Sequence, residues 1–305
     1  MNRAQRIAAK RARKEKDAAP LQSKKETIEA IRESSPVFVM GRGGSGTRLM
    51  SSMVQELGFF FGNKINPSQD SIDWKAPIVG LALKHGAQIE LPLKISEKEQ
   101  NDLILAAIKS LKPKFGTLID RQPTPPWGFK IPHLVLVFPL LAETFPNARF
   151  IHLVRHPVPS SVSKSRRKAD KTSRPGGGQG RVLLPPAIQY AKGEVKGTGE
   201  MITPAQLKDI PIWKLNAYSW NHQVDRAHEY GTQFLKDRYL EILYEDACNR
   251  PQIEMNRLTE FLGLREHKVK TEIKPSPSTQ YGKSGNNKEV WEICEEAAKK
   301  FGYTY

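Results

Sequence analysis

Two short segments of the sequence combine glycine, hydroxyl and arginine side chains in patterns that suit phosphate binding. The first is Gly41-Arg-Gly-Gly-Ser-Gly-Thr47, between an apolar run and an amphipathic segment. Glycines allow backbone N–H groups to approach an anion closely, and the start of a helix adds the positive end of its dipole. The residues that we expect to contact phosphate here are Arg42, Gly43, Gly44, Ser45, Gly46, Thr47 and Arg48.

The second segment, residues 150–163, repeats this design. Arg155 ends an apolar run, and Ser163 falls eight positions later, in the first turns of the helix expected next. A guanidinium and a hydroxyl that converge on one point suit a phosphate monoester, because arginine can donate two parallel charge-assisted hydrogen bonds. Two separate phosphate sites imply one ligand with phosphates at both ends. The alternatives are a tight structural turn for the first segment and a salt bridge for Arg155.

The first segment also fits two well-known nucleotide-binding patterns by letter, but it lacks a residue that each requires. The dinucleotide pattern GxGxxG requires an acidic residue after the second strand, and residues 59–63 contain none. The triphosphatase pattern GxxxxGK[ST] requires a lysine where Thr47 stands. Neither pattern is therefore complete.

Strands that alternate with helices must position these segments. Apolar runs predict strands over residues 37–40, 149–155 and 239–244, and a further one over 58–62. Helical periodicity, caps and prolines predict helices over residues 48–58, 103–111, 132–145, from about 159, 212–230, 254–262 and 289–301. The alternation predicts an α/β fold with a central parallel sheet flanked by helices.

The positive charge of the chain is concentrated in two places. The formal net charge is +16, and residues 1–25 hold nine basic and two acidic side chains, whereas residues 161–181 hold seven and one. A nucleic-acid coat usually spreads its charge over a surface, so nucleic acid is not an expected partner. We expect residues 1–34 to form a basic, flexible arm and residues 35–305 a single domain. Residues 168–208, rich in glycine, proline and basic side chains, are expected to form a mobile lid-like insertion.

The composition argues against several classes of protein. No apolar stretch approaches the ~20 residues of a membrane span. The basic N-terminus has no apolar segment behind it, as a secretory signal would, so we expect a cytoplasmic protein. Cys248 and Cys294 have neither the spacing of a zinc site nor that of a disulfide framework. We therefore expect no metal ion.

The two phosphate segments resemble those of the sulfotransferases that use 3′-phosphoadenosine 5′-phosphosulfate (PAPS). Residues 37–58 resemble that family's loop for the 5′-phosphosulfate, and residues 147–163 resemble its 3′-phosphate motif; residues 127–133 and 238–262 are similar to further family segments. The resemblance implies a P-loop NTPase-like three-layer sandwich. It also implies PAPS as the sulfuryl donor and adenosine 3′,5′-bisphosphate (PAP) as the product. The acceptor would be a hydroxyl or amine of a small molecule, glycan or peptide.

The resemblance also implies roles for individual side chains. Lys130 resembles the lysine that contacts the sulfuryl group. His133 is one candidate for the general base, since histidine titrates in the required range. Asp70 is the other, because some family members use a carboxylate in that region. Lys283, in the loop over residues 274–288, corresponds in position to a segment that closes over the nucleotide and would contact the 3′-phosphate.

The glycine segment departs from the family at one position. Where sulfotransferases usually have Lys or Arg before Ser-Gly-Thr, this sequence has Gly44. Arg42 and Arg48 flank the loop and could supply the charge, and we assign that catalytic role to Arg48. Two alternatives stay open at this point: a P-loop kinase or NTPase, which would need Mg²⁺, and a non-catalytic relative that binds a nucleotide or another anion. Each of these classes is compatible with an oligomer.

Overall fold

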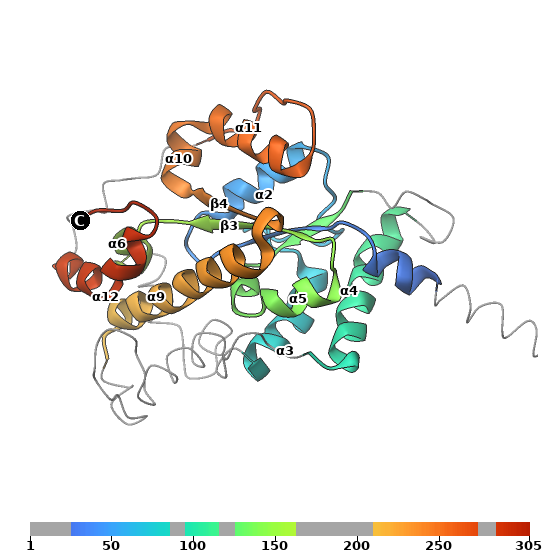
Figure 1. The fold of residues 1–305 in the computed structure, drawn as a ribbon, viewed down its shortest axis with the longest axis horizontal. Helices are drawn as coiled ribbons and strands as arrows, with labels where there is room; N and C mark the ends of the chain where they lie inside the picture. Colours follow the sequence, from blue (N-terminus) through green and yellow to red (C-terminus); the bar gives the residue numbers. More distant parts are fainter. Residues whose placement is uncertain (1–25, 86–94, 116–125, 163–209, 274–284) are drawn as a thin grey trace, which may run out of the picture.

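In the computed structural model, helices cover both faces of a parallel sheet and form three layers (Figure 1). The structure describes residues 26–85, 95–115, 126–162, 210–273 and 285–305. This architecture confirms the α/β fold with a central parallel sheet flanked by helices.

The sheet contains four parallel strands in the order β2-β1-β3-β4. The strands are β2 (Gly128–Lys130), β1 (Val37–Met40), β3 (Arg149–Val154) and β4 (Tyr239–Leu243). Each of the pairs β1–β2, β1–β3 and β3–β4 runs parallel. Strands β2 and β3 therefore lie on opposite sides of β1. The chain continues from β1 to one side and from β3 to the other, so the strand order reverses between β1 and β3.

The prediction of a strand over residues 58–62 was wrong. In this segment Phe60 forms only an isolated bridge to Trp127, and Gly58 and Gly62 have φ values of 94° and 104°, which break the extended run. The strand beside β1 is instead β2. A Cβ atom at Gly128 would collide with the carbonyl oxygen of Val37, so only glycine permits β2 to approach β1 so closely.

The helices lie on two faces and one end of the sheet (Figure 1). One face carries α2 (Thr47–Glu56), α10 (Tyr244–Asn249) and α11 (Pro251–Leu262); the other carries α3 (Lys75–His85), α4 (Glu97–Phe115), α5 (Phe138–Thr144) and α9 (Ile212–Tyr230). The helices α6 (Pro157–Val162) and α12 (Asn287–Lys299) pack together and against α9. Among the described helices, none is both long and apolar enough to cross a membrane.

Most predicted helices are present, but one is divided. The segment predicted as a helix over residues 132–145 contains a 3₁₀ turn, Pro132–Leu136, and then α5. Val137 separates them with φ −137° and ψ 12°. Pro139 lacks an N–H group and is tolerated in the first turn of a helix, so a new helix begins just before it. Helices α3 and α10 were not predicted from the sequence.

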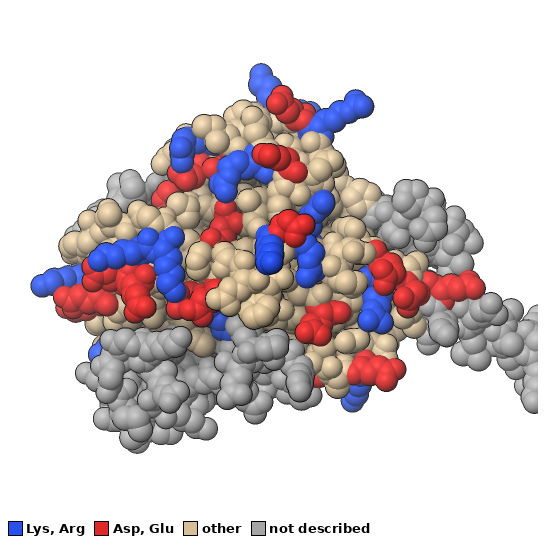
Figure 2. All heavy atoms as spheres, in the orientation of Figure 1, with Lys and Arg blue, Asp and Glu red and all other residues tan. Residues whose placement is uncertain are grey.

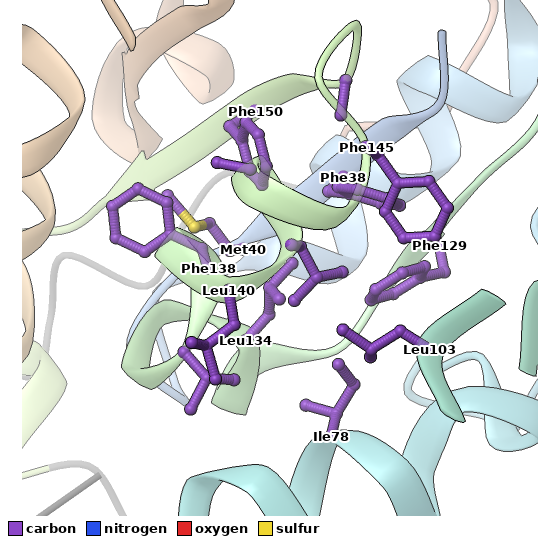
Figure 3. Close-up of a cluster of buried hydrophobic side chains, with 14 of the residues drawn as sticks. Phe38, Met40, Ile78, Leu103, Phe129, Leu134, Phe138, Leu140, Phe145 and Phe150 are labelled. Carbon is purple, nitrogen blue, oxygen red and sulfur yellow. The ribbon is translucent and has the colours of Figure 1, made fainter. Parts of the chain in front are cut away.

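The side chains of β1 alternate between the two faces of the sheet and contribute to the hydrophobic core on each face. Phe38 and Met40 pack on the α5 side with buried residues of α3 and α4, as Figure 3 shows for Phe38, Ile78 and Leu103. Val37 and Val39 point to the α2 and α11 side. This period of two is the expected geometry of a strand that is buried on both faces.

The structure describes part of the predicted N-terminal arm but none of the predicted insertion. Residues 26–32, part of the predicted arm, form a helix whose Ile31 is fully buried against the core, so this part belongs to the folded domain. Residues 1–25 and the predicted insertion over 168–208 lie outside the described residues. Figure 2 shows acidic and basic side chains interspersed on the described part of one face.

We predict that Phe38→Ala destabilises the protein severely. The Phe38 ring is fully buried among aromatic rings, with centroid distances of 4.5 Å to Phe129 and 5.4 Å to Phe150. Loss of a buried phenylalanine costs about 3 to 5 kcal/mol. Urea unfolding measures the change. Phe234→Ala is the control, because Phe234 is 54% exposed; an equal loss in both variants would contradict the central place of Phe38.

Candidate functional site

A cavity of about 600 Å³ opens at the edge where the carboxyl ends of the strands meet. Ligands in open α/β sheets bind at this edge, beside the point where the strand order reverses. The loops after β1 and β3 and the residues that end β2 and follow β4 all reach the cavity. Its described lining consists of Gly43, Gly44, Gly46, Thr47, Arg48, Leu49, Ser52, Ser68, Asp70, Lys130, Pro132, Arg155, Tyr244, Thr271 and Glu272.

The glycine segment forms a turn that leads directly into α2. Gly44 and Gly46 have φ values of 98° and 87°, in the left-handed region that glycine adopts without strain. A Cβ atom at Gly46 would also collide with the ring of Tyr244. Helix α2 begins at Thr47, so the first N–H groups of the helix, which have no partners within it, lie at the cavity. This geometry suits a phosphate or sulfate group.

Arg42 and Ser45, both predicted as ligands, are turned away from the cavity. Ser45 is buried, and its hydroxyl donates to the Arg42 carbonyl at 2.5 Å, which closes the turn. The guanidinium of Arg42 is fully buried and donates to the carbonyl oxygen of Ser160 at 2.9 Å and to Oδ1 of Asn216 at 2.7 Å. In this structure Arg42 therefore supports the loop from behind.

Arg155 lines the cavity together with the glycine segment. Its guanidinium lies 4.7 Å from the centre of the Tyr244 ring and donates to the carbonyl oxygen of Gly44 at 3.3 Å. The Tyr244 ring thus contacts both phosphate segments, since it packs on Gly46 as well. Cation–π contact and the hydrogen bond hold the guanidinium at the side of the cavity that the glycine segment forms.

Lys130 and Asp70 form a close ion pair at the cavity. Nζ of Lys130 lies 2.5 Å from Oδ1 of Asp70 and donates to the Ser68 carbonyl at 2.8 Å. Lys130 is only 2% exposed. Burial lowers the pKa of Lys130 below its ordinary value of 10.5, Asp70 opposes this shift, and Arg48 adds to it. The pair brings a cation and a carboxylate to the same place.

A turn over residues 66–70 presents Asp70 to Lys130. The side-chain oxygen of Asn66 accepts the N–H groups of Ser68 and Asp70 at 2.9 and 2.8 Å. The amide nitrogen of Asn66 donates to Asp70 Oδ2 at 3.1 Å. Gln69 has a φ of 63°, which is uncommon outside glycine. The hydrogen bonds of Asn66 hold this turn in place.

The other predicted residues have different positions. His133 is half-buried in the 3₁₀ turn after β2 and is not among the described residues that line the cavity, although its neighbour Pro132 is. Ser163 and Lys283 lie outside the described residues. His152, on β3, is a buried core histidine with Nδ1 2.7 Å from the hydroxyl of Tyr239.

Seven of the described cavity residues were not predicted from the sequence: Leu49, Ser52, Ser68, Pro132, Tyr244, Thr271 and Glu272. Tyr244 directly follows β4, and the rule that parallel strands end at one edge would have found it. Thr271 and Glu272 carry no such signal, because they lie in a segment without regular structure. Contacts with a distant helix determine their position.

Glu56, at the end of α2, holds the segment that carries Thr271 and Glu272. One carboxylate oxygen accepts the Lys270 N–H at 2.6 Å and lies 2.8 Å from Nε2 of His267; the other accepts both the N–H and the hydroxyl of Thr271, at 2.7 and 2.6 Å. Burial alone would raise the pKa of Glu56, but the hydrogen bonds from Thr271, Lys270 and His267 lower it below 4.5. Helix α2 therefore contributes to the cavity at both ends. Its first residue, Thr47, lines the cavity, and its last residue, Glu56, holds the segment of Thr271 and Glu272.

The sequence profile of the sulfotransferase family matches residues 36–179. No curated protein matches the sequence significantly. Among solved structures, the chain is similar to a sulfotransferase domain from the curacin biosynthetic pathway, with 14% identity, 90% of this chain and 99% of that chain covered and a TM-score of 0.47.

Two further solved structures are similar to the chain. A Mycobacterium avium sulfotransferase has 14% identity, coverage of 94% of this chain and 81% of that chain, and a TM-score of 0.47. A mouse sulfotransferase complexed with PAP has 15% identity, coverage of 81% and 66%, and a TM-score of 0.37. These TM-scores are below 0.5, and the match to the family profile covers residues 36–179.

We predict that Glu56→Gln loosens the segment over residues 267–272. The variant loses charge-assisted hydrogen bonds, and each bond of this kind contributes about 1.5 to 3 kcal/mol to the free energy of unfolding. At pH 7 its free energy of unfolding should fall, and the amides of Lys270 and Thr271 should exchange hydrogen faster. Glu260→Gln, at an exposed position on α11, is the matched control.

The effect of Glu56→Gln should also depend on pH. Because the folded protein holds the pKa of Glu56 below 4.5, the stabilisation is complete above that value and is lost as the pH falls through the lowered pKa. The wild type and the variant should therefore converge in stability in acid. A difference that persists unchanged below the lowered pKa would contradict the role of the carboxylate.

Proposed function

We propose that the chain is a sulfotransferase, which the family match over residues 36–179 supports, and that it transfers a sulfuryl group from PAPS to an acceptor hydroxyl or amine and releases PAP. One observation carries the proposal. The glycine turn at the start of α2 and the guanidinium of Arg155 face one cavity, together with the buried Lys130–Asp70 pair. Two anion-binding groups suit a nucleotide with phosphates at both ends, and the ion pair supplies groups that a transfer reaction needs.

The glycine turn is the proposed site of the 5′-phosphosulfate. Gly43, Gly44 and Gly46 line the cavity, and the N–H groups at the start of α2 can donate to its oxygens. Arg48 lines the cavity and is exposed, so its side chain can supply the cation that Gly44 does not. These features support the assignment of the 5′-phosphosulfate to this turn.

The 3′-phosphate is assigned to Arg155. Its guanidinium contacts Tyr244 and Gly44 at the cavity, and its planar arrangement of N–H donors suits parallel hydrogen bonds to phosphate oxygens. Ser163 and Lys283 remain predicted contacts of the same phosphate. Arg42 is assigned no contact, because its guanidinium is buried behind the turn.

When bound, PAPS supplies the sulfuryl group that is transferred in line to the acceptor. Lys130 would stabilise negative charge on the sulfuryl and bridging oxygens, and Arg48 would assist from the rim of the cavity. Asp70 would accept the proton of the acceptor hydroxyl. We favour Asp70 over His133 as the general base because Asp70 lines the cavity and already contacts Lys130. The ion pair holds both groups together at the cavity, where donor and acceptor would meet.

The kinase alternative is less well supported by the site. Thr47 occupies the position of the required lysine. A kinase would also need a carboxylate after an apolar strand to hold Mg²⁺. Asp246, three residues beyond β4, pairs with Arg250 at 2.7 Å. A non-catalytic binding protein would have no use for a lysine and a carboxylate paired at the cavity, so the ion pair favours an enzyme.

Ligand binding tests the proposed donor. We expect isothermal titration calorimetry without Mg²⁺ to show much tighter binding of PAP than of AMP or ATP, because only PAP can occupy both anion-binding groups. Arg155→Met should remove most of that preference and leave AMP affinity nearly unchanged. Equal or tighter binding of ATP would overturn the proposal and favour phosphoryl transfer.

Lys130 should act as a cation, and this predicts a specific pH dependence. Because burial lowers the pKa of Lys130 below 10.5, kcat/KM should fall as the pH rises through that lowered value, when the ammonium loses its proton. Lys130→Arg should shift this decrease to higher pH, since arginine keeps its charge.

Removal of the Lys130 charge should lower turnover at every pH. Lys130→Met should lower kcat by about 10²- to 10³-fold, as loss of one donor to a developing negative charge does in other enzymes, with little change in PAP affinity. Lys98→Met, at an exposed position on α4, should behave as the wild type. Unchanged turnover in Lys130→Met, or an alkaline decrease that Lys130→Arg does not move, would exclude Lys130 from the chemistry.

A further inference from the structure

The guanidinium of Arg42 connects three parts of the structure behind the cavity. It donates to the carbonyl oxygen of Gly43 in its own turn at 3.3 Å and to that of Ser160 in α6 at 2.9 Å. It also donates to Asn216 in α9, to the carbonyl oxygen at 3.1 Å and to Oδ1 at 2.7 Å. Arg42 is fully buried and Asn216 is 2% exposed, so solvent does not compete for these bonds.

The same face of α9 also holds the loop that carries Arg155. Nε1 of Trp220 donates to the carbonyl oxygen of Arg155 at 2.8 Å. Asn216 and Trp220 are one helical turn apart and therefore lie on one face of α9. Asn216 also donates from Nδ2 to the carbonyl oxygen of Ser161, just beyond Arg155 in the chain. A single rigid helix thus supports both anion-binding segments from behind.

We propose that Arg42 and Asn216 are positioning residues that fix the spacing between the glycine turn and Arg155, and that this spacing determines selectivity for a donor with phosphates at both ends. The inference rests on the proposed function, because it takes these two segments as the sites of the two phosphate groups. It assigns Arg42 a role in binding without contact to the ligand.

Arginine suits this task better than any other cation. Its planar guanidinium has five N–H donors in a fixed arrangement and can bind several carbonyl oxygens at once, whereas a lysine ammonium acts as a point charge. Removal of the guanidinium would leave buried carbonyl oxygens without these donors, which is costly. The contacts therefore define a single relative position of the turn, α6 and α9.

The two phosphate groups of one ligand gain from each other only when their sites are correctly spaced. Once the first group is bound, the second site meets its phosphate at a high effective concentration, and this gain is lost if the geometry does not permit simultaneous contact. A ligand with one phosphate uses one site and has no such requirement. Loosening the Arg42–Asn216 contacts should therefore weaken PAP binding much more than AMP binding.

The test compares Asn216→Ala and Arg42→Lys with the wild type, using PAP and AMP as ligands in calorimetry. We expect the affinity for PAP to fall about tenfold or more and that for AMP to change less than about threefold, as expected when one site no longer assists the other. With PAPS, KM should rise more than kcat falls. Gln223→Ala is the matched control, because it removes a buried amide of α9 whose donor contact, among the described residues, is to Ser219 of the same helix at 2.8 Å.

The outcomes separate this inference from the proposed function. A wild type without preference for PAP over AMP would overturn the proposed donor, and the inference with it. A wild type with that preference, retained in Asn216→Ala, would overturn the inference alone. An equal loss for PAP and AMP would also overturn it, since a general loosening of the fold has that effect. If Arg42→Lys does not fold, Asn216→Ala decides the question, because alanine is compatible with a helix.

Discussion

Parallel pairing of the four strands is the constraint on which the site depends. Because the strands all run in one direction, their carboxyl ends meet at one edge, and the order β2-β1-β3-β4 places the reversal between β1 and β3. The glycine turn, Lys130, Arg155 and Tyr244 come from four separate regions of the chain and reach the same cavity for this reason alone. The close approach of β2 to β1, which requires Gly128, brings Lys130 to that edge.

The cations at this edge differ in how they are held, and the difference follows from burial. A buried cation requires acceptors, and each acceptor fixes its direction. Arg42 has carbonyl and amide oxygens from three segments and stays behind the turn. Lys130 has Asp70 and the Ser68 carbonyl and stays at the cavity. Arg48 is exposed and is the cation that can adjust to a bound ligand.

Local signals predicted much of the fold but failed where tertiary contacts dominate. The bounds of β1 and α9 agree with the predicted ranges, because an apolar run and a strong helical pattern are properties of the local sequence. Residues 58–62 have the composition of a strand but not its conformation, because glycines at both ends leave the extended region. Strand β2 is only three residues long, too short for any period to be recognised.

Residue types and short spacings were enough to predict the α/β class, the two candidate anion-binding segments and the candidates Lys130 and Asp70. The folded structure was needed to show that Arg42 faces the interior, that Glu56 holds the segment of Thr271, and that Tyr244 packs on Gly46. These arrangements depend on contacts between residues far apart in the chain. Such contacts form only after the strands have brought their loops together, so no local pattern in the sequence records them.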